Sequence, residues 1–130
     1  MAKDYIVRGL NHIGIMTDDP ARCAQFYIDN LGFRPYYEAA LGPKAIVFVE
    51  LGGMVLEFVP SEARDTDGIV DHIAIEVQGI EALVAELKAK GVVPEDVKVG
   101  GMPSFFPNGA KNIFFRGPAG ERIELFDHSK

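Results

Sequence analysis

Hydrophobic and polar positions along the first half of the chain predict four strands and one helix. Apolar and polar residues alternate over 10–16, which is the pattern of a half-buried strand. The following segment, up to about residue 31, places its apolar side chains on one face of a helix. Apolar segments at 33–38, 45–51 and 54–59 predict three more strands. The first half therefore has the order βαβββ.

The second half repeats this order. Residues 72–77 predict a strand, and residues 80–90 predict a helix with apolar side chains facing inward. Three later segments predict strands, at 98–102, 112–116 and 122–126. The polar segment 60–70 is expected to link the two halves, and the ends of the chain, about 1–5 and 127–130, are expected to be loose.

Turn-forming residues mark where the two helices begin and end. Asp18 and Asp19 precede Pro20, so an N-cap side chain stands before a proline suited to the first helical turn. Gly32 and Gly91 are expected to end the two helices, because glycine readily adopts the left-handed conformation found there.

An internal repeat connects the two halves. The segment His12–Ile15 (HIGI) returns 60 residues later as His72–Ile75 (HIAI), and each half ends on a glycine turn and a strand containing a glutamate, Glu57 or Glu124. The second half carries about seven more residues, which we assign to the loop at 100–109. The sequence therefore predicts an α+β protein, a single domain over 1–130 with one βαβββ unit at about 8–60 and another at about 71–127.

Composition narrows the class of protein. The net charge of −6 and the absence of a basic segment argue against a nucleic-acid partner. The one cysteine, Cys23, cannot form an internal disulfide and is expected to be a packed helix residue. No apolar run resembles a signal peptide or a membrane span, so we expect a cytoplasmic protein with no membrane partner.

Four residues at matched places in the repeat suggest a metal site. His12 and His72 open the first strand of each half, and Glu57 and Glu124 lie within the last strand between apolar neighbours. A carboxylate buried in such a strand needs a strong partner, and a divalent cation is one. Two imidazoles and two carboxylates suit Zn, Ni, Co, Fe or Mn better than Ca or Mg. An octahedral ion with four protein ligands would keep two positions open, as catalytic sites do.

These residues resemble the vicinal oxygen chelate superfamily, which includes glyoxalase I, methylmalonyl-CoA epimerase, extradiol dioxygenases, and fosfomycin and bleomycin resistance proteins. The resemblance covers about residues 8–127 and rests on the repeat, the ligand order His, Glu, His, Glu, and the ending Gly-x-x-Ile-Glu-Leu at 120–125. It implies that the two units form a curved mixed sheet around a metal cavity. It also implies one divalent metal ion held by His12, Glu57, His72 and Glu124, and a homodimer.

The resemblance points to the glyoxalase and epimerase branch, because dioxygenases and fosfomycin enzymes lack a ligand glutamate in the first unit. In that branch the enzyme abstracts a proton next to a carbonyl through a metal-stabilised enediolate. We therefore expect a lyase or isomerase acting on a small oxo- or hydroxy-acyl substrate. Glu124 or Glu57 would be the general base, with Glu124 favoured.

Departures from the two best-known branch members leave the substrate open. Bacterial glyoxalase I has arginine and asparagine for glutathione where this chain has Met16 and Ser61, and the epimerases usually have glutamine in place of Glu57. The alternatives are an Fe or Mn dioxygenase, a binding protein like the bleomycin resistance members, or an enzyme that transfers a thiol to an antibiotic.

The remaining aromatic and histidine residues have simpler expected roles. Phe105 and Phe106, in the loop at 100–109, would either form an apolar wall over a substrate or plug the edge of the core. Phe48 and Phe114 are expected in the core, and His128 is expected to be exposed in a polar tail.

Overall fold

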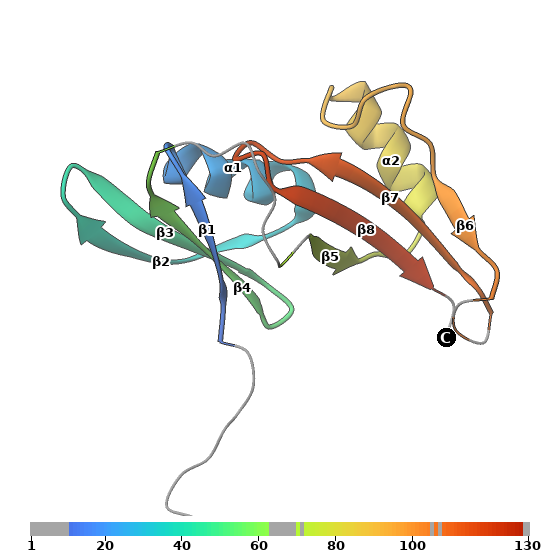
Figure 1. Cartoon of the computed structure of the whole chain (residues 1–130), viewed down its shortest axis with the longest axis horizontal. Helices are drawn as coiled ribbons and strands as arrows, with labels where there is room; N and C mark the ends of the chain where they lie inside the picture. Colours follow the sequence, from blue (N-terminus) through green and yellow to red (C-terminus); the bar gives the residue numbers. More distant parts are fainter. Residues whose placement is uncertain (1–10, 63–69, 71, 105, 107, 129–130) are drawn as a thin grey trace, which may run out of the picture. The chain divides into compact units, whose positions relative to one another are not determined.

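The computed structural model describes residues 11–62, 70, 72–104, 106 and 108–128. The chain divides into two compact units, Met1–Ala63 and Arg64–Lys130. Each contains four strands and one helix in the order βαβββ, so the predicted α+β class and the repeat are confirmed (Figure 1). None of the described helices has the length and apolar composition that crossing a membrane requires.

The elements of the first unit are β1 (Ile13–Thr17), α1 (Pro20–Leu31), β2 (Arg34–Leu41), β3 (Lys44–Leu51) and β4 (Met54–Pro60). Those of the second unit are β5 (Ile73–Glu76), α2 (Ile80–Ala89), β6 (Gly100–Met102), β7 (Ala110–Arg116) and β8 (Arg122–His128). The predicted bounds differ most at the end of β2, which continues three residues further than expected. In the second unit, β6 begins two residues later and β8 continues two residues further.

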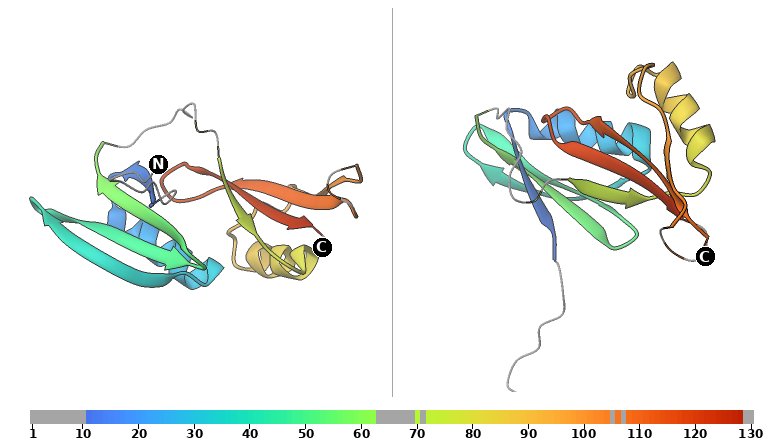
Figure 2. Two further views of the ribbon diagram at one scale, coloured as in Figure 1. Left: turned by 90° about the horizontal axis from the view of Figure 1, so that it is seen from below. Right: turned by 45° about the vertical axis from the view of Figure 1, so that its right-hand side comes forward.

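Both units have the same sheet topology. The strand order is β1-β4-β3-β2 in the first unit and β5-β8-β7-β6 in the second. The first strand of each unit pairs parallel with the last, and the other pairings are antiparallel. Each helix lies along one face of the sheet of its own unit (Figure 2). The strand that carries each candidate glutamate is therefore an inner strand, paired on both sides.

Helix α1 begins and ends where the sequence predicts. The Asp19 side chain accepts a hydrogen bond from the backbone N–H of Arg22, and Pro20 occupies the first turn. Gly32 ends the helix in the left-handed conformation, with φ of 75°. Cys23 is buried on the inner face of the helix, as expected, with its sulfur 3.2 Å from the Thr17 hydroxyl.

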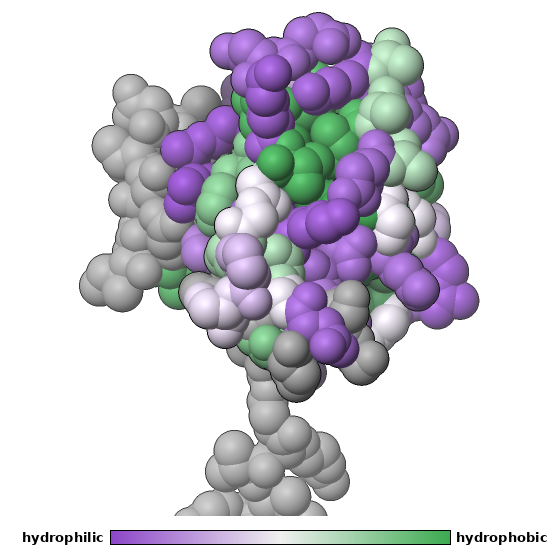
Figure 3. Space-filling view, turned by 90° about the vertical axis from the view of Figure 1, so that its right-hand side faces the viewer, coloured by the Kyte–Doolittle hydropathy of each residue, from purple (hydrophilic) through white to green (hydrophobic). Residues whose placement is uncertain are grey.

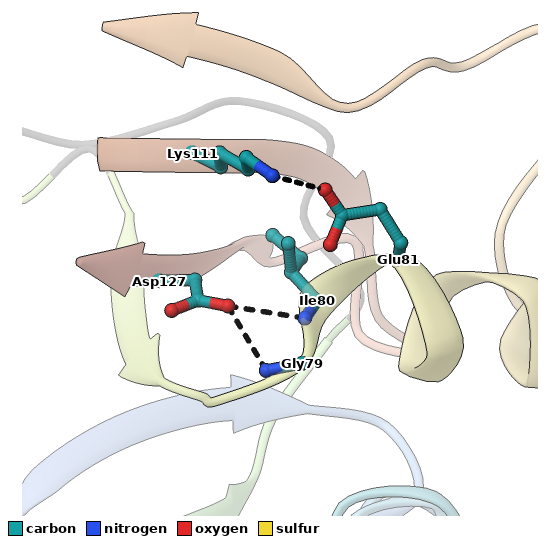
Figure 4. Close-up of polar contacts among 5 residues, drawn as sticks. All are labelled: Gly79, Ile80, Glu81, Lys111 and Asp127. Carbon is teal, nitrogen blue, oxygen red and sulfur yellow. Dashed lines mark hydrogen bonds and ion pairs between the residues drawn. The ribbon is translucent and has the colours of Figure 1, made fainter. Parts of the chain in front are cut away.

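The beginning of α2 is capped by a residue from the end of the chain. The N-cap position, Gly79, has no capping side chain of its own. Instead, the carboxylate of Asp127 on β8 accepts hydrogen bonds from the backbone N–H groups of Gly79 and Ile80, at 3.0 and 3.1 Å (Figure 4). The expectation that residues 127 and 128 belong to a loose tail is therefore wrong, because both pair with β7.

Removing this cap is expected to destabilise the second unit. Asp127→Ala leaves two N–H groups at the positive end of α2 without their acceptor, which should lower the free energy of unfolding by about 1 kcal/mol. Asp127→Asn keeps an acceptor and removes the charge, so its loss should be smaller. Urea denaturation followed by circular dichroism measures both. Equal stability of the alanine variant and the parent would contradict the capping role.

A second contact joins α2 to the sheet at the surface. The Lys111 ammonium on β7 lies 2.5 Å from the Glu81 carboxylate in the first turn of α2 (Figure 4). The hydrogen bond from Lys111 is the main reason that the pKa of Glu81 lies below its ordinary value. The same hydrogen bond raises the pKa of Lys111. Both side chains are exposed, so the pair adds little stability. Figure 3 views the part of the molecule that holds α2 and shows mostly hydrophilic side chains around a smaller apolar area.

Candidate metal centre

In the first unit, the parallel pairing of β1 with β4 brings His12 to Glu57. Leu56 and Phe58 are fully buried, so alternation along β4 places Glu57 on the opposite face. His12 directly precedes β1, and its Nε2 atom lies 3.2 Å from Oε1 of Glu57. The residue opposite Glu57 on β1 is Gly14, where a Cβ atom would lie 3.4 Å from the same oxygen. The small residue at this position leaves room for the carboxylate.

The His12 ring is oriented by contacts on its other sides. Its Nδ1 atom lies 2.7 Å from the side-chain oxygen of Asn11, which can only accept a hydrogen bond. A proton on Nδ1 can be donated to this oxygen, and that tautomer leaves Nε2 free of a proton, which is the form in which histidine binds a metal. The edge of the ring meets Phe48 on β3, with ring centroids 5.7 Å apart.

The second unit builds the same pair in a more buried place. Glu124 on β8 lies opposite Ala74 on β5, and its Oε1 atom is 3.1 Å from Nε2 of His72. The Glu124 side chain is 9% exposed, against 20% for Glu57. The other oxygen of Glu124, Oε2, accepts a hydrogen bond of 2.8 Å from the amide of Asn112 on β7. No local pattern in the sequence points to Asn112 as a partner of Glu124.

Phe48 and Phe114 are not core residues, and this prediction is wrong. Each lies directly opposite a candidate glutamate on the neighbouring strand and is half-buried. Phe114 contacts the His72 ring edge at a centroid distance of 5.3 Å, as Phe48 contacts His12. The Arg122 guanidinium lies 3.8 Å from the centre of the Phe114 ring. Their matched positions in the repeat were the signal that could have placed both rings beside the histidines.

The geometry of each pair suits two ligands of one metal ion. Donors that bind an ion at right angles, each at about 2.1 Å, lie about 3 Å apart, close to both Nε2–Oε1 separations. Among the described residues, no three His, Cys, Asp or Glu side chains form a group that could hold a metal. The structure thus brings His12 to Glu57 and His72 to Glu124, and the four-ligand centre stays a prediction.

His128 is not the exposed tail residue that the sequence suggested. It lies within β8, its side chain is 17% exposed, and its Nε2 atom is 3.7 Å from the Glu76 carboxylate. Phe106 stacks on the His128 ring with centroids 4.4 Å apart and also meets the edge of Phe126. These contacts place Phe106 against the end of β8, although half of its surface remains exposed. Phe105 lies outside the described residues.

A pocket of about 360 Å³ opens in the first unit next to Phe48. It is bounded by α1, including Gln25 and Ile28, and by the exposed Tyr36 and Tyr37 of β2. Phe48, whose ring meets the edge of His12, is among the residues that line the pocket. Its volume is within the range of small-molecule sites.

Comparisons with known proteins agree with the resemblance read from the sequence. Residues 9–125 match the family described as glyoxalase/bleomycin resistance protein/dioxygenase superfamily. The chain is 35% identical over 114 residues to human mitochondrial methylmalonyl-CoA epimerase and 29% identical over 113 residues to the mouse protein. Each match covers 75% of this chain and 64% of the relative, so the chain spans less than two thirds of their length.

Solved structures share the fold at low sequence identity. The fosfomycin resistance protein FosX from Listeria monocytogenes, crystallised with Mn(II) and sulfate, has a TM-score of 0.71 and 17% identity, with 95% of each chain covered. A glyoxalase family protein from Enterococcus faecalis has a TM-score of 0.67 and 24% identity, covering 92% of this chain and 97% of that protein. These likenesses show the fold, and the match over residues 9–125 shows that the chain belongs to the glyoxalase/bleomycin resistance protein/dioxygenase superfamily.

Proposed function

We propose that this protein is a metal-dependent isomerase or lyase that removes a proton from the carbon next to a carbonyl group. The observation that carries the proposal is the matched pair of His and Glu side chains in each unit, with Nε2–Oε1 distances of 3.2 and 3.1 Å. The presence of Glu57 in the first unit supplies a second carboxylate, which proton-transfer chemistry can use.

The proposed metal ligands are His12, Glu57, His72 and Glu124, and the ion is Ni, Co, Zn, Mn or Fe. The ion would act as a Lewis acid that stabilises the negative charge on the substrate oxygens after the proton has left the carbon. A residue of the chain would transfer the proton itself. A glutamate accepts the proton from carbon as the C–H bond breaks, and returning that proton to carbon restores the carboxylate.

The relatives suggest which substrate to test first. The methylmalonyl-CoA epimerases are 35% and 29% identical to this chain, which favours an acyl thioester with a carboxylate on its second carbon. The proton on that carbon lies between two carbonyl groups and is comparatively acidic. Met16 and Ser61, in place of the glutathione-binding residues of glyoxalase I, argue against lactoylglutathione.

The test is solvent deuterium exchange with the purified full chain. Methylmalonyl-CoA is incubated in D₂O with protein reconstituted with Co²⁺, Ni²⁺ or Mn²⁺, and mass spectrometry measures deuterium on the second carbon. We expect exchange that is removed by chelation with EDTA and restored by adding the metal. The same preparations are tested with the methylglyoxal–glutathione adduct and with a catechol under oxygen.

The outcomes separate the classes of protein. Exchange on either acyl substrate supports the proposed chemistry and assigns the substrate. Ring opening of the catechol with oxygen uptake, and no exchange, would replace the proposal with a dioxygenase. If the chain binds no metal after reconstitution, the proposal is wrong and a ligand-binding protein becomes the better description.

A further inference from the structure

The two carboxylates of the His–Glu pairs are held differently. Both oxygens of Glu124 are engaged, because Oε1 faces His72 at 3.1 Å and Oε2 accepts the 2.8 Å hydrogen bond from Asn112. Glu57 meets His12 through Oε1 at 3.2 Å, and its side chain is about twice as exposed as that of Glu124. The repeat is therefore symmetric in its ligands but not in the contacts around them.

Among the described residues of the first unit, none makes a contact with Glu57 like that of Asn112 with Glu124, and the repeat explains why. Phe114 lies opposite Glu124, and Phe48 lies opposite Glu57, so these two phenylalanines occupy the same place. The residue two positions before Phe114 is Asn112, and the residue two positions before Phe48 is Ile46. Side chains two apart on a strand share a face. Ile46 therefore holds the matching place beside Glu57 but has no hydrogen-bond donor.

The strand on the other side of Asn112 leaves space for this amide. Gly100 on β6 pairs with Asn112, and a Cβ atom at Gly100 would lie 3.2 Å from Oδ1 of the asparagine. That separation is tighter than ordinary packing allows, so any larger residue at this position would press on the amide. At Gly101, the next residue, a Cβ atom would have no neighbouring atom within 4 Å. Both glycines have ordinary backbone angles, which makes them a matched pair for substitution.

We propose that Asn112 is a positioning residue that holds Oε2 of Glu124, so that Oε1 stays beside His72 as a fixed metal ligand. Because Ile46 provides no such contact, the Glu57 carboxylate keeps the rotational freedom that a group exchanging between metal and proton requires. The asymmetry divides the roles between the two glutamates, with Glu124 as the fixed ligand and Glu57 as the acid–base group. This inference rests on the proposed function, since it assigns parts within the same metal site.

The test is metal affinity, measured by calorimetric titration of metal-free protein with Co²⁺ or Ni²⁺. Asn112→Leu has nearly the same shape but no donor. Residues that orient metal ligands contribute about 10- to 100-fold in affinity, and we expect a loss of that size. Ile46→Leu, at the matching place in the first unit, should bind the metal as the parent does. An Asn112→Leu variant with the parental Kd would overturn the positioning role.

Two further variants separate the hydrogen bond from general packing. Gly100→Ala should weaken metal binding less than Asn112→Leu does, because the amide is displaced rather than removed, and Gly101→Ala should not change it. Ile46→Asn places a donor beside Glu57, and we expect it to bind metal at least as tightly while exchanging deuterium more slowly. Faster exchange in Ile46→Asn would contradict the division of roles.

A measurement on the metal-free protein keeps this inference distinct from the proposed function. The side-chain amide of Asn112 gives its own ¹⁵N–¹H signals, and a hydrogen bond to a carboxylate shifts one proton downfield. We expect that shift in the parent and its loss in Glu124→Ala, with circular dichroism as the check on folding. A shift that does not respond to Glu124→Ala overturns the positioning role. A shift that does respond, in a protein that binds no metal, contradicts the proposed function and leaves the contact standing.

Discussion

His72→Ala is expected to abolish metal binding, reducing the bound ion from about one per chain to nearly none. The His72 imidazole supplies the only nitrogen in its pair, and its Nε2 atom lies 3.1 Å from Glu124, so alanine removes one ligand and the orienting partner of another. His12→Ala should act in the same way through Glu57. Elemental mass spectrometry of protein reconstituted with Ni²⁺ and then desalted measures the loss directly.

The third histidine is the natural control for this experiment. His128 lies in the same strand as Glu124, stacks on Phe106 and faces Glu76, and it is not part of either His–Glu pair. His128→Ala should retain the metal even if it lowers stability. Equal metal content in His72→Ala and the parent would exclude the proposed centre, whereas loss in all three variants would point to general unfolding, which circular dichroism detects.

The sequence was a good guide to the fold and to the unit in which each candidate histidine and glutamate lies. The repeat set the order of strands and placed each pair at equivalent positions, and parallel pairing of the first and last strand brings the members of each pair together. The local signals at Asp19, Pro20 and Gly32 set the ends of α1, because capping depends on residues within one turn of the helix end.

Contacts between distant residues were the part that the sequence did not reveal. From the sequence alone, an apolar residue in a strand is expected in the core, because the face that the helix covers is not known. Phe48 and Phe114 lie on the opposite face, beside the histidines. Asp127 caps a helix that begins 47 residues earlier, and Asn112 reaches Glu124 only through the register of β7 with β8. Such partners follow from the pairing of strands, which local patterns do not specify.

Those contacts change which glutamate we expect to act as the base. The sequence alone favoured Glu124, whereas its two engaged oxygens now favour a fixed ligand and leave Glu57 for proton transfer. Glu57→Gln should therefore keep the metal, because the side-chain oxygen of glutamine can still bind a metal ion. The rate of deuterium exchange should fall by about 10²- to 10⁴-fold, the usual contribution of a general base.

Glu124→Gln is the matched comparison, and its expected failure is of a different kind. Glutamine at position 124 loses the negative charge that attracts the Asn112 amide, and it adds an NH₂ group where the native side chain is only 9% exposed. We therefore expect a lower metal affinity, and a lower rate of deuterium exchange as a consequence. Exchange measured at saturating metal distinguishes the two glutamates. Under that condition Glu124→Gln should recover part of the parental rate and Glu57→Gln should recover none. The reverse result would return the base to Glu124, because a carboxylate that transfers the proton cannot be replaced by supplying more metal.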